Sequence, residues 1–233
     1  ERAEIRSKQE ILDLGCGWGS FSLYAAQKFP NSNFTAVSNS DDQINFIKSE
    51  AKELGITNLL ALKQDMNQLN LKNNFDRIVS IEMFEHMRNY KNLLKRLSNL
   101  MVEDGKLFVH VFCHKQSAYL YEIKNERDWM TKYFFTGGIM PSKDIFSFFD
   151  EDLTVVNSWE INGKHYSQTS KAWLKNMDRN RTSIIKIFEK TYGVENANIW
   201  FQRWRIFFMS CEKLFGYNSG REWGVSHYRF VKR

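Results

Sequence analysis

The chain has 233 residues, of which 42% are hydrophobic and 15% aromatic, enough for one substantial core within one domain. Its net charge of +6 is spread along the sequence, which argues against nucleic-acid binding, and no apolar run reaches the length of a membrane-spanning helix. Three cysteines, without zinc-site spacing or an even count, favour a cytoplasmic protein without disulfides or a structural metal.

Short apolar strands alternate with helical segments in the first half of the chain. Strands are expected at 11–14, 34–37, 59–62, 75–81 and 105–111, and helices at about 19–29, 41–54 and 90–100. This alternation predicts an α/β fold, with a Rossmann-like, doubly wound and mostly parallel sheet. Ligands of such sheets bind outside the carboxyl ends of the strands, so the residues that follow each strand are the candidates for a site.

Beyond residue 115 the pattern changes to aromatic-rich segments. The expected elements are a loop at 136–142, a helix at 143–149, strands at 153–156 and 158–161, long helices near 168–192 and 196–215, and a strand at 225–231. We interpret residues 1–115 as a cofactor-binding core, and 116–233 as a substrate-site elaboration that also completes the sheet of the same domain. Because the chain starts without Met and reaches its first strand at once, we expect a further native segment upstream.

Three glycines at alternate positions, Gly15, Gly17 and Gly19, directly follow the first predicted strand. They leave no side chains where a nucleotide must approach the backbone, and the next helix directs its N-terminal amides to the same place. A dinucleotide-binding loop would place its third glycine at position 20, which is Ser20 here. The spacing therefore favours the S-adenosylmethionine loop of class I methyltransferases, with a purely structural turn as the alternative.

Two carboxylates and an imidazole, from Glu82, Glu85 and His86, directly follow the strand at 75–81. If a helical turn begins at residue 83, Glu85 could pair with His86 or with a cationic substrate while Glu82 points toward the cofactor. An amine that arrives as an ammonium must lose a proton before it attacks a methyl group, and either group type can take that proton. The structural alternative is an acidic helix start with a hydrogen-bonded histidine.

Further candidate side chains follow the strand at 105–111 and lie in the second half of the chain. His110, Cys113 and His114 form a cluster without a carboxylate in the same loop, so we expect hydrogen bonds there and no metal. Tyr166 is either a pocket hydroxyl or a packed aromatic residue. An aromatic stripe at helical spacing predicts mostly core, or else a wall for a flat or cationic acceptor; it comprises Trp200, Trp204, Phe207, Phe208, Cys211 and Phe215.

Five motifs occur together along the whole chain. They are D-L-G-C-G-W-G-S at 13–20, S-I-E-M-F-E-H-M at 80–87, F-V-H-V-F-C-H-K at 108–115, K-Y-F-F-T-G-G-I-M-P-S at 132–142 and N-G-K-H-Y-S-Q-T at 162–169. In this combination the sequence resembles the coclaurine N-methyltransferase-like branch of the cyclopropane-fatty-acid synthase superfamily. The resemblance implies a methyltransferase that uses S-adenosylmethionine and acts on a small amine.

The resemblance also implies roles for single residues. The cofactor-binding positions are Asp13, Gly15, Cys16, Gly17, Gly19 and Ile81, with Ser38, Asn39 and Gln43 in the ribose region and Asp65 and Met66 in the adenine loop. In the amine-methylating branch, Glu82, Glu85 and His86 fall on the positions that bind and deprotonate the acceptor nitrogen.

The lipid-modifying branch of the same superfamily is the alternative. There an unsaturated membrane lipid attacks the methyl group, and a bound bicarbonate, at positions matched by Glu85, His110 and Tyr166, removes the excess proton. Glu82 favours the amine branch, because the lipid enzymes commonly have a smaller residue there, in a phrase similar to G-M-F-E-H. A third hypothesis is a non-catalytic cofactor-binding module, since a fold does not by itself establish a function.

Overall fold

The computed structural model describes residues 1–72, 74–135 and 137–233, so Thr136 of the predicted loop lies outside the described residues. Its strands are β1 (Glu10–Leu14), β2 (Asn33–Ser38), β3 (Leu59–Lys63), β4 (Phe75–Ile81), β5 (Met101–His114), β6 (Tyr119–Leu120), β7 (Ile139–Met140), β8 (Leu153–Ile161) and β9 (Trp223–Lys232). Its α-helices are α1 (Ser20–Lys28), α2 (Asp41–Glu53), α3 (Tyr90–Asn99), α4 (Trp129–Tyr133), α5 (Lys164–Arg179), α6 (Arg181–Tyr192) and α7 (Val194–Gly216). Short 3₁₀ turns are η1 (Met66–Gln68), η2 (Phe84–His86), η3 (Ile145–Phe148) and η4 (Tyr217–Gly220).

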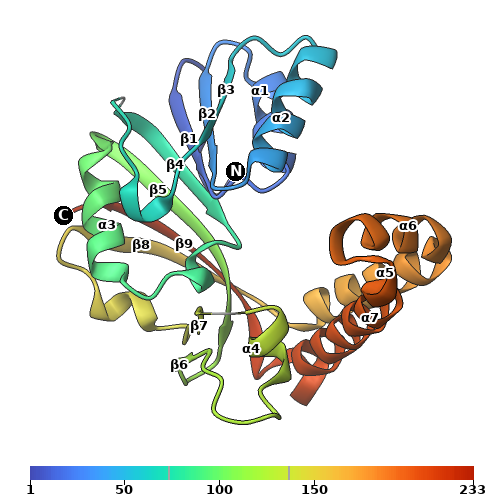
Figure 1. The fold of residues 1–233 in the computed structure, drawn as a ribbon. Helices are drawn as coiled ribbons and strands as arrows, with labels where there is room; N and C mark the ends of the chain where they lie inside the picture. The colour runs from blue at the N-terminus through green and yellow to red at the C-terminus, as the bar shows by residue number, and fades with distance from the viewer. Residues whose placement is uncertain (73, 136) are drawn as a thin grey trace.

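Seven strands form one twisted sheet in the order β3-β2-β1-β4-β5-β9-β8 (Figure 1). Strands β1 to β5 pair in parallel, whereas β9 is antiparallel to both β5 and β8. The predicted Rossmann-like, mostly parallel sheet is therefore confirmed. The strand order reverses between β1 and β4, and a crevice at such a reversal is where ligands of open α/β sheets bind.

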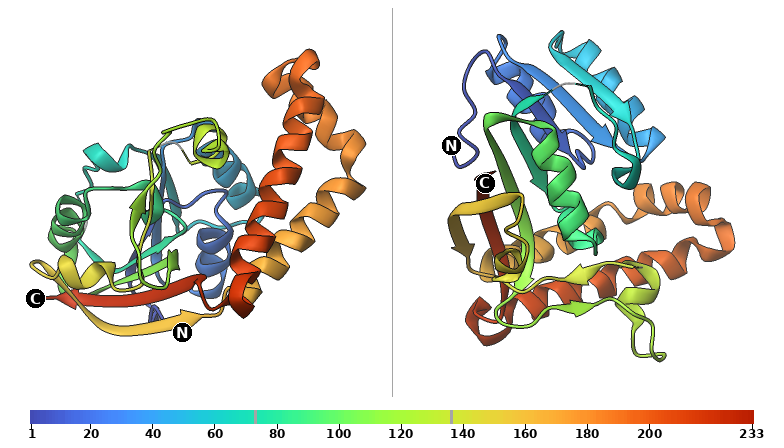
Figure 2. Two further views of the ribbon diagram at one scale, coloured as in Figure 1. Left: turned by 90° about the horizontal axis from the view of Figure 1, so that it is seen from below. Right: turned by 90° about the vertical axis from the view of Figure 1, so that its left-hand side faces the viewer.

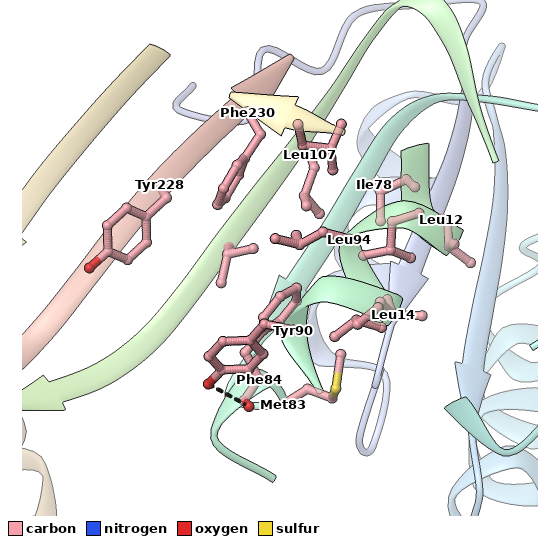
Figure 3. Close-up of a cluster of buried hydrophobic side chains, with 14 of the residues drawn as sticks. Leu12, Leu14, Ile78, Met83, Phe84, Tyr90, Leu94, Leu107, Tyr228 and Phe230 are labelled. Carbon is pink, nitrogen blue, oxygen red and sulfur yellow. Dashed lines mark hydrogen bonds between the residues drawn. The ribbon is translucent and has the colours of Figure 1, made fainter. Parts of the chain in front are cut away.

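Helices cover both faces of this sheet, because successive buried residues of β1 pack into different clusters. Ile11 packs with Ala25 of α1, whereas Leu12 and Leu14 belong to the core under α3. Helix α3 buries Leu94 and three other side chains at helical spacing against this core (Figure 3). The sheet is thus wound on both faces, which fixes the carboxyl ends of β1 and β4 at one edge.

The second half of the chain departs from the predicted elements at several places. The predicted loop at 136–142 contains the short strand β7, which pairs with β6, and α4 was not predicted. The expected strands at 153–156 and 158–161 are one strand, β8, because a register shift between Val155 and Asn157 absorbs the irregularity without ending the pairing. The expected helix at 143–149 is only the 3₁₀ turn η3. The first of the two long helices is divided into α5 and α6 at Asn180, whose backbone leaves the helical region.

Helices α5, α6 and α7 form an arm that projects from the sheet (Figures 1 and 2). Strand β8 lies parallel to β5, because both are antiparallel to β9, so α5 begins at the edge where β1 to β5 end. The long helix α7 packs against both α5 and α6. Within the described parts of the chain, no helix is both long and apolar enough to cross a membrane.

Candidate functional site

The glycine bend after β1 has the backbone geometry that nucleotide loops need. Gly15, Gly17 and Gly19 have φ values of +78°, +53° and +79°. A Cβ on Gly15 would lie 2.6 Å from the Cγ of Met83, whereas a Cβ on Gly17 would meet no atom within 4 Å. Gly15 is therefore required for close packing, and Gly17 exposes bare backbone to open space.

Asp13 and Cys16 lie behind this bend. Asp13 is buried and accepts a hydrogen bond from the hydroxyl of Ser22 in α1, so it joins the strand to the helix. Burial raises the pKa of Asp13 to about 7 and that of the Cys16 thiol to about 12. The thiol therefore stays protonated, and the buried Asp13 carboxyl supports the bend through its contact with Ser22.

The raised pKa of Asp13 predicts a pH-dependent stability. Between about pH 4 and pH 7 the folded protein holds the Asp13 proton while the unfolded chain has lost it, so the free energy of unfolding falls as pH rises. At about 1.4 kcal/mol per unit, the loss reaches up to about 4 kcal/mol. Between pH 5 and pH 7 the Asp13 contribution is about 2.7 kcal/mol. Urea unfolding at pH 5 and pH 8 should show it as the difference in pH dependence between the native protein and Asp13→Asn. An unchanged pH slope in Asp13→Asn would contradict the assignment.

The ends of β2 and β3 supply the other predicted cofactor positions. Ser38 donates a 2.6 Å hydrogen bond to the side-chain oxygen of Gln43, so these two residues meet at the start of α2, whereas Asn39 is exposed. Asp65 is exposed after β3 and accepts from the backbone amide of Asn67, which caps η1.

Met66 and Ile81 lie at the same edge of the sheet. Met66 begins η1, and its carbonyl accepts a 3.2 Å hydrogen bond from the Arg96 guanidinium of α3. Ile81 is the last residue of β4 and pairs with His110 of β5. All the predicted cofactor positions therefore follow or end strands β1 to β4, and their contacts with a cofactor stay a prediction.

Glu82 occupies an unusual backbone position directly after β4. Its φ of +53° is rare for a residue with a side chain and costs about 1–2 kcal/mol relative to glycine. Its amide donates a 3.0 Å hydrogen bond to the carbonyl of His110, which fixes the turn. Backbone strain of this kind collects at functional sites, where the surrounding structure holds it.

The Glu82 carboxylate lies between an imidazole and a phenol. Its Oε1 is 2.9 Å from Nε2 of His110, and its Oε2 accepts a 3.1 Å hydrogen bond from the Tyr166 hydroxyl. The predicted pocket residues His110 and Tyr166 thus meet on one carboxylate, although they come from β5 and α5. Only the Tyr166 contact has hydrogen-bond geometry, so Oε1 of Glu82, although it lies close to His110, is left without a hydrogen-bond partner among the described residues.

Glu85 differs from Glu82 in its environment. Its side chain is only 2% exposed, and its Oε2 has no hydrogen-bond partner among the described residues. Burial, and next the charge of Glu82, raise the pKa of Glu85 well above its ordinary value. The two carboxyl groups therefore differ in environment, and the buried surroundings of Glu85 favour its protonated form.

His86 ends the 3₁₀ turn η2 beside this pair. Its amide donates a 3.0 Å hydrogen bond to the Met83 carbonyl, and its ring stacks on Phe135 at a centroid distance of 6.3 Å. The Tyr90 hydroxyl holds the Phe84 carbonyl of the same turn (Figure 3). Although much of His86 is exposed, loss of water from part of the ring lowers its pKa, which keeps the imidazole neutral and able to accept a proton.

Two cavities lie near this group. The larger, of about 710 Å³, is lined by aromatic and aliphatic side chains together with the charged residues of the segment 122–128; its lining includes Tyr121, Phe135, Tyr166, Phe207, Cys211 and Phe215. The smaller, of about 400 Å³, is lined by Glu82, His110, Tyr166 and Trp173 among others. Half of the predicted aromatic stripe therefore forms a cavity wall, while its members Trp200 and Trp204 pack on Phe134.

The predicted cluster after the strand at 105–111 lies within β5, which continues to His114, and its members do not stay together. His114 accepts backbone hydrogen bonds on Nδ1 from Gln116 and Ser117 and lies 3.2 Å from Glu222 on its other side. The Cys113 thiol instead lies 3.1 Å from the Ser226 hydroxyl. Among the residues that the structure describes, no three His, Cys, Asp or Glu side chains are grouped to hold a metal ion.

His227 is a neighbour of the site that the sequence analysis missed. Its Nε2 is 2.8 Å from Nδ1 of His110, and β5 and β9 pair these two residues in register. They are 117 positions apart, so no local motif could connect them. Only the alternation of β9, combined with the correct pairing of β9 with β5, could have located His227.

The sheet order with its antiparallel β9, the glycine bend after β1 and the acidic turn after β4 define the fold of a class I methyltransferase. Within this class, the chain belongs to the mycolic acid cyclopropane synthetase family, whose family model matches residues 1–221.

Similar proteins come from both branches of the resemblance. The chain is 43% identical over its whole length to (S)-coclaurine N-methyltransferase of Thalictrum flavum subsp. glaucum, and covers 66% of that protein. It is 30% identical, over 74% of its length and 43% of that protein, to the cyclopropane-fatty-acyl-phospholipid synthase of Escherichia coli (strain K12).

A solved structure is also similar over nearly the whole chain. It is coclaurine N-methyltransferase bound to N-methylheliamine and SAH, with a TM-score of 0.94 and 42% identity over 99% of this chain and 67% of that chain. The chain thus spans about two thirds of the length of its N-methyltransferase relatives. The predicted resemblance to the amine branch is confirmed.

Proposed function

We propose that this protein transfers a methyl group from S-adenosylmethionine to the nitrogen of a small amine. The bare backbone at Gly17 and the amino-terminal end of α1 offer the cofactor the site that its adenosyl and methionine groups need. The similar N-methyltransferase whose solved structure holds SAH supports the same cofactor here. Support for the acceptor comes from Glu82, a charged carboxylate at the end of β4.

The chemistry needs an amine with a free electron pair. The acceptor arrives as an ammonium, Glu82 attracts it, and a carboxylate or the neutral His86 imidazole takes its proton. The nitrogen then attacks the sulfonium methyl group in line, so the N–C bond forms as the C–S bond breaks and the demethylated cofactor leaves. The resemblance implied that Glu85 and His86 assist the deprotonation. The raised pKa of Glu85 instead favours its protonated form, so we assign the proton transfer to Glu82 and His86.

The larger cavity suits an aromatic acceptor. Tyr121, Phe135 and Phe207 contribute ring faces and edges to its wall, and ring faces attract cations as well as flat apolar groups. The named relatives include coclaurine and pavine N-methyltransferases. We infer that the acceptor is a secondary amine attached to an aromatic ring system, of the benzylisoquinoline type.

Cyclopropane synthesis on lipids is the second candidate, supported by the family and by the E. coli relative. That reaction needs His110 and Tyr166 to hold bicarbonate. In this chain the Tyr166 hydroxyl already donates to the Glu82 carboxylate at 3.1 Å, and Nε2 of His110 lies 2.9 Å from its other oxygen. A carboxylate matches bicarbonate in charge and shape. This occupancy supports the amine reaction over the lipid reaction.

Label transfer separates these candidates. The full-length protein is incubated with methyl-labelled S-adenosylmethionine and either a tetrahydroisoquinoline or vesicles of unsaturated phospholipid. We expect label in the amine and none in the lipid. Label in the lipid alone would overturn the proposal. If the protein bound the cofactor but transferred label to neither acceptor, the result would support the third hypothesis, a non-catalytic cofactor-binding module.

A further inference from the structure

A row of polar side chains leads from Glu82 toward the start of the chain. Nε2 of His110 lies 2.9 Å from Glu82, and Nδ1 of His110 lies 2.8 Å from Nε2 of His227. Nδ1 of His227 lies 2.6 Å from the guanidinium of Arg2. The sheet builds the middle of this row, because β5 and β9 pair His110 with His227, and β9 and β8 pair His227 with Trp159.

The donors and acceptors of this row can be assigned in only one direction. A guanidinium donates hydrogen bonds and accepts none, so Nδ1 of His227 must accept from Arg2. The proton of a neutral His227 ring then lies on Nε2, which donates to Nδ1 of His110. The proton of a neutral His110 ring lies in turn on Nε2, the nitrogen that is 2.9 Å from Oε1 of Glu82.

Both rings must be neutral for the row to hold. A second proton on His110 would place its Nδ1–H against the Nε2–H of His227, and a second proton on His227 would face the Arg2 guanidinium. Burial, followed by the nearby His110 and Arg2, lowers the pKa of His227 to about 4, which agrees with this assignment.

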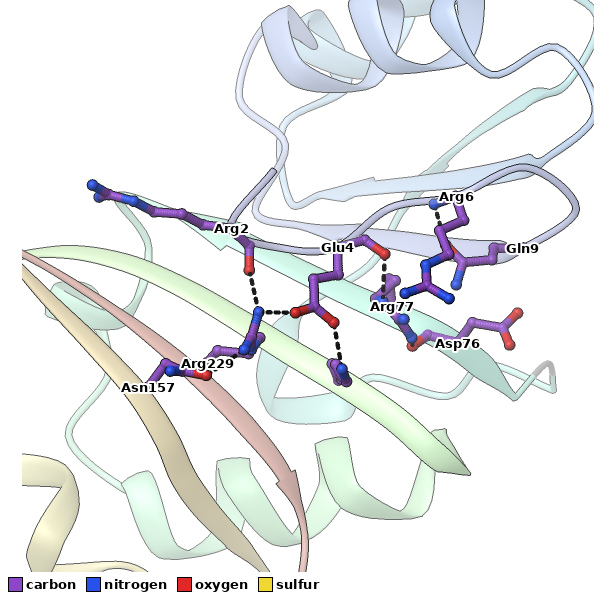
Figure 4. A network of polar contacts seen from close by, with 9 residues as sticks. Arg2, Glu4, Arg6, Gln9, Asp76, Arg77, Asn157 and Arg229 are labelled. Atoms are coloured by element: carbon purple, nitrogen blue, oxygen red, sulfur yellow. Dashed lines mark hydrogen bonds and ion pairs between the residues drawn. The ribbon is translucent and has the colours of Figure 1, made fainter.

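Arg2 is held in place by several contacts of its own segment. Its guanidinium carbon lies 5.1 Å from the centre of the Trp159 ring. Its carbonyl accepts a hydrogen bond from Arg229, and the carboxylate of Glu4 is paired with both Arg229 and Lys106 (Figure 4). The start of the described chain is therefore fixed across β5 and β9, which places the Arg2 side chain at the end of the row.

We propose that Arg2 and His227 are positioning residues that hold His110 as the Nε2–H tautomer, so that His110 always donates to Glu82. This role rests on the proposed function of Glu82 as the charged carboxylate of an amine methyltransferase. Without Arg2, His227 can reverse its two nitrogens, and His110 can then present a lone pair to Glu82. The lone pair of His110 and the Glu82 carboxylate would then repel each other, because both are hydrogen-bond acceptors. Glu82 would turn away, or it would already carry a proton and could not take one from the amine.

The tautomers can be read without measuring turnover. Nitrogen-15 NMR of the histidine rings in the full protein should show His110 and His227 as single Nε2–H tautomers. Arg2→Ala should replace the single state of His110 by a mixture, whereas Arg2→Lys should preserve it because an ammonium also only donates. Arg6→Ala removes an exposed cation from the same segment and should change neither ring. A single Nε2–H state of His110 that persists in Arg2→Ala would overturn the proposal.

Kinetics test whether the tautomer matters for the reaction. Arg2→Ala and His227→Phe should each lower kcat by about tenfold, less than loss of an acid–base group itself, with the KM for S-adenosylmethionine unchanged. Arg2→Lys should restore most of the rate. If Arg2→Ala changed the tautomer of His110 but left kcat normal, Arg2 would have no positioning role in the reaction. A native enzyme that methylates no amine but shows the expected tautomers would instead refute the proposed function alone.

Discussion

Glu82→Gln is expected to lower kcat by about 10²- to 10⁴-fold, the range for loss of a general base, while the dissociation constant for S-adenosylmethionine stays within about twofold. The amide keeps the size of the side chain and can still accept a hydrogen bond from Tyr166 or His110. It cannot attract an ammonium or take its proton. Rapid-quench measurement of methyl transfer, with calorimetry of cofactor binding, gives both quantities.

Glu85→Gln is the matched control for this variant. Because Glu85 is buried and its pKa is raised well above the ordinary value, it is protonated in the folded protein, and glutamine resembles a protonated glutamic acid in shape and charge. We expect a loss in kcat of less than about tenfold, well below that for removing a general base. If Glu85→Gln lost as much activity as Glu82→Gln, the assignment of charge to Glu82 would be wrong.

Gly17→Ala is expected to weaken binding of S-adenosylmethionine by about a hundredfold, or about 2.7 kcal/mol. The new methyl group would enter the open space in front of the bend, where no protein atom lies within 4 Å. Its positive φ also costs about 1–2 kcal/mol of folding stability. Calorimetric titration with the cofactor measures the first effect and urea unfolding the second.

Gly55→Ala separates these two effects. Gly55 follows α2 and has a φ of +66°, and a methyl group added there would meet no atom within 4 Å. It therefore shares the strain and the open surroundings of Gly17 but lies away from the bend. We expect Gly55→Ala to lose similar stability and to bind the cofactor normally. Equal affinities in the two variants would show that the cofactor does not lie on Gly17.

The first half of the chain was predictable because its signals are local. The strands β1 to β5 follow from short apolar runs, and Ser40 caps α2 through the amide of Gln43 as its sequence pattern indicates. Parallel strands bring their carboxyl ends to one edge, so the glycine bend and the Glu82–His86 turn could be placed there without knowledge of any contact.

The arrangement inside the site was not predictable, because it depends on contacts between distant segments. Tyr166 reaches Glu82 across 84 positions of sequence, and His227 reaches His110 only through the pairing of β9 with β5. The positive φ of Glu82 has no sequence signal either, since a glutamate ordinarily avoids that region and the surrounding contacts impose it. The break at Asn180 was likewise hidden within a continuous helical pattern.

A crystal structure of the full-length protein with S-adenosylhomocysteine and an N-methylated aromatic amine would test the proposed reaction at its centre. We expect the sulfur beside the bend from Gly15 to Gly19 and the ring system of the amine in the larger cavity. Its nitrogen should lie beside Tyr166, which lines both cavities, within about 3–3.5 Å of a Glu82 oxygen. An amine nitrogen held away from Glu82, or a cofactor bound away from the glycine bend, would contradict it.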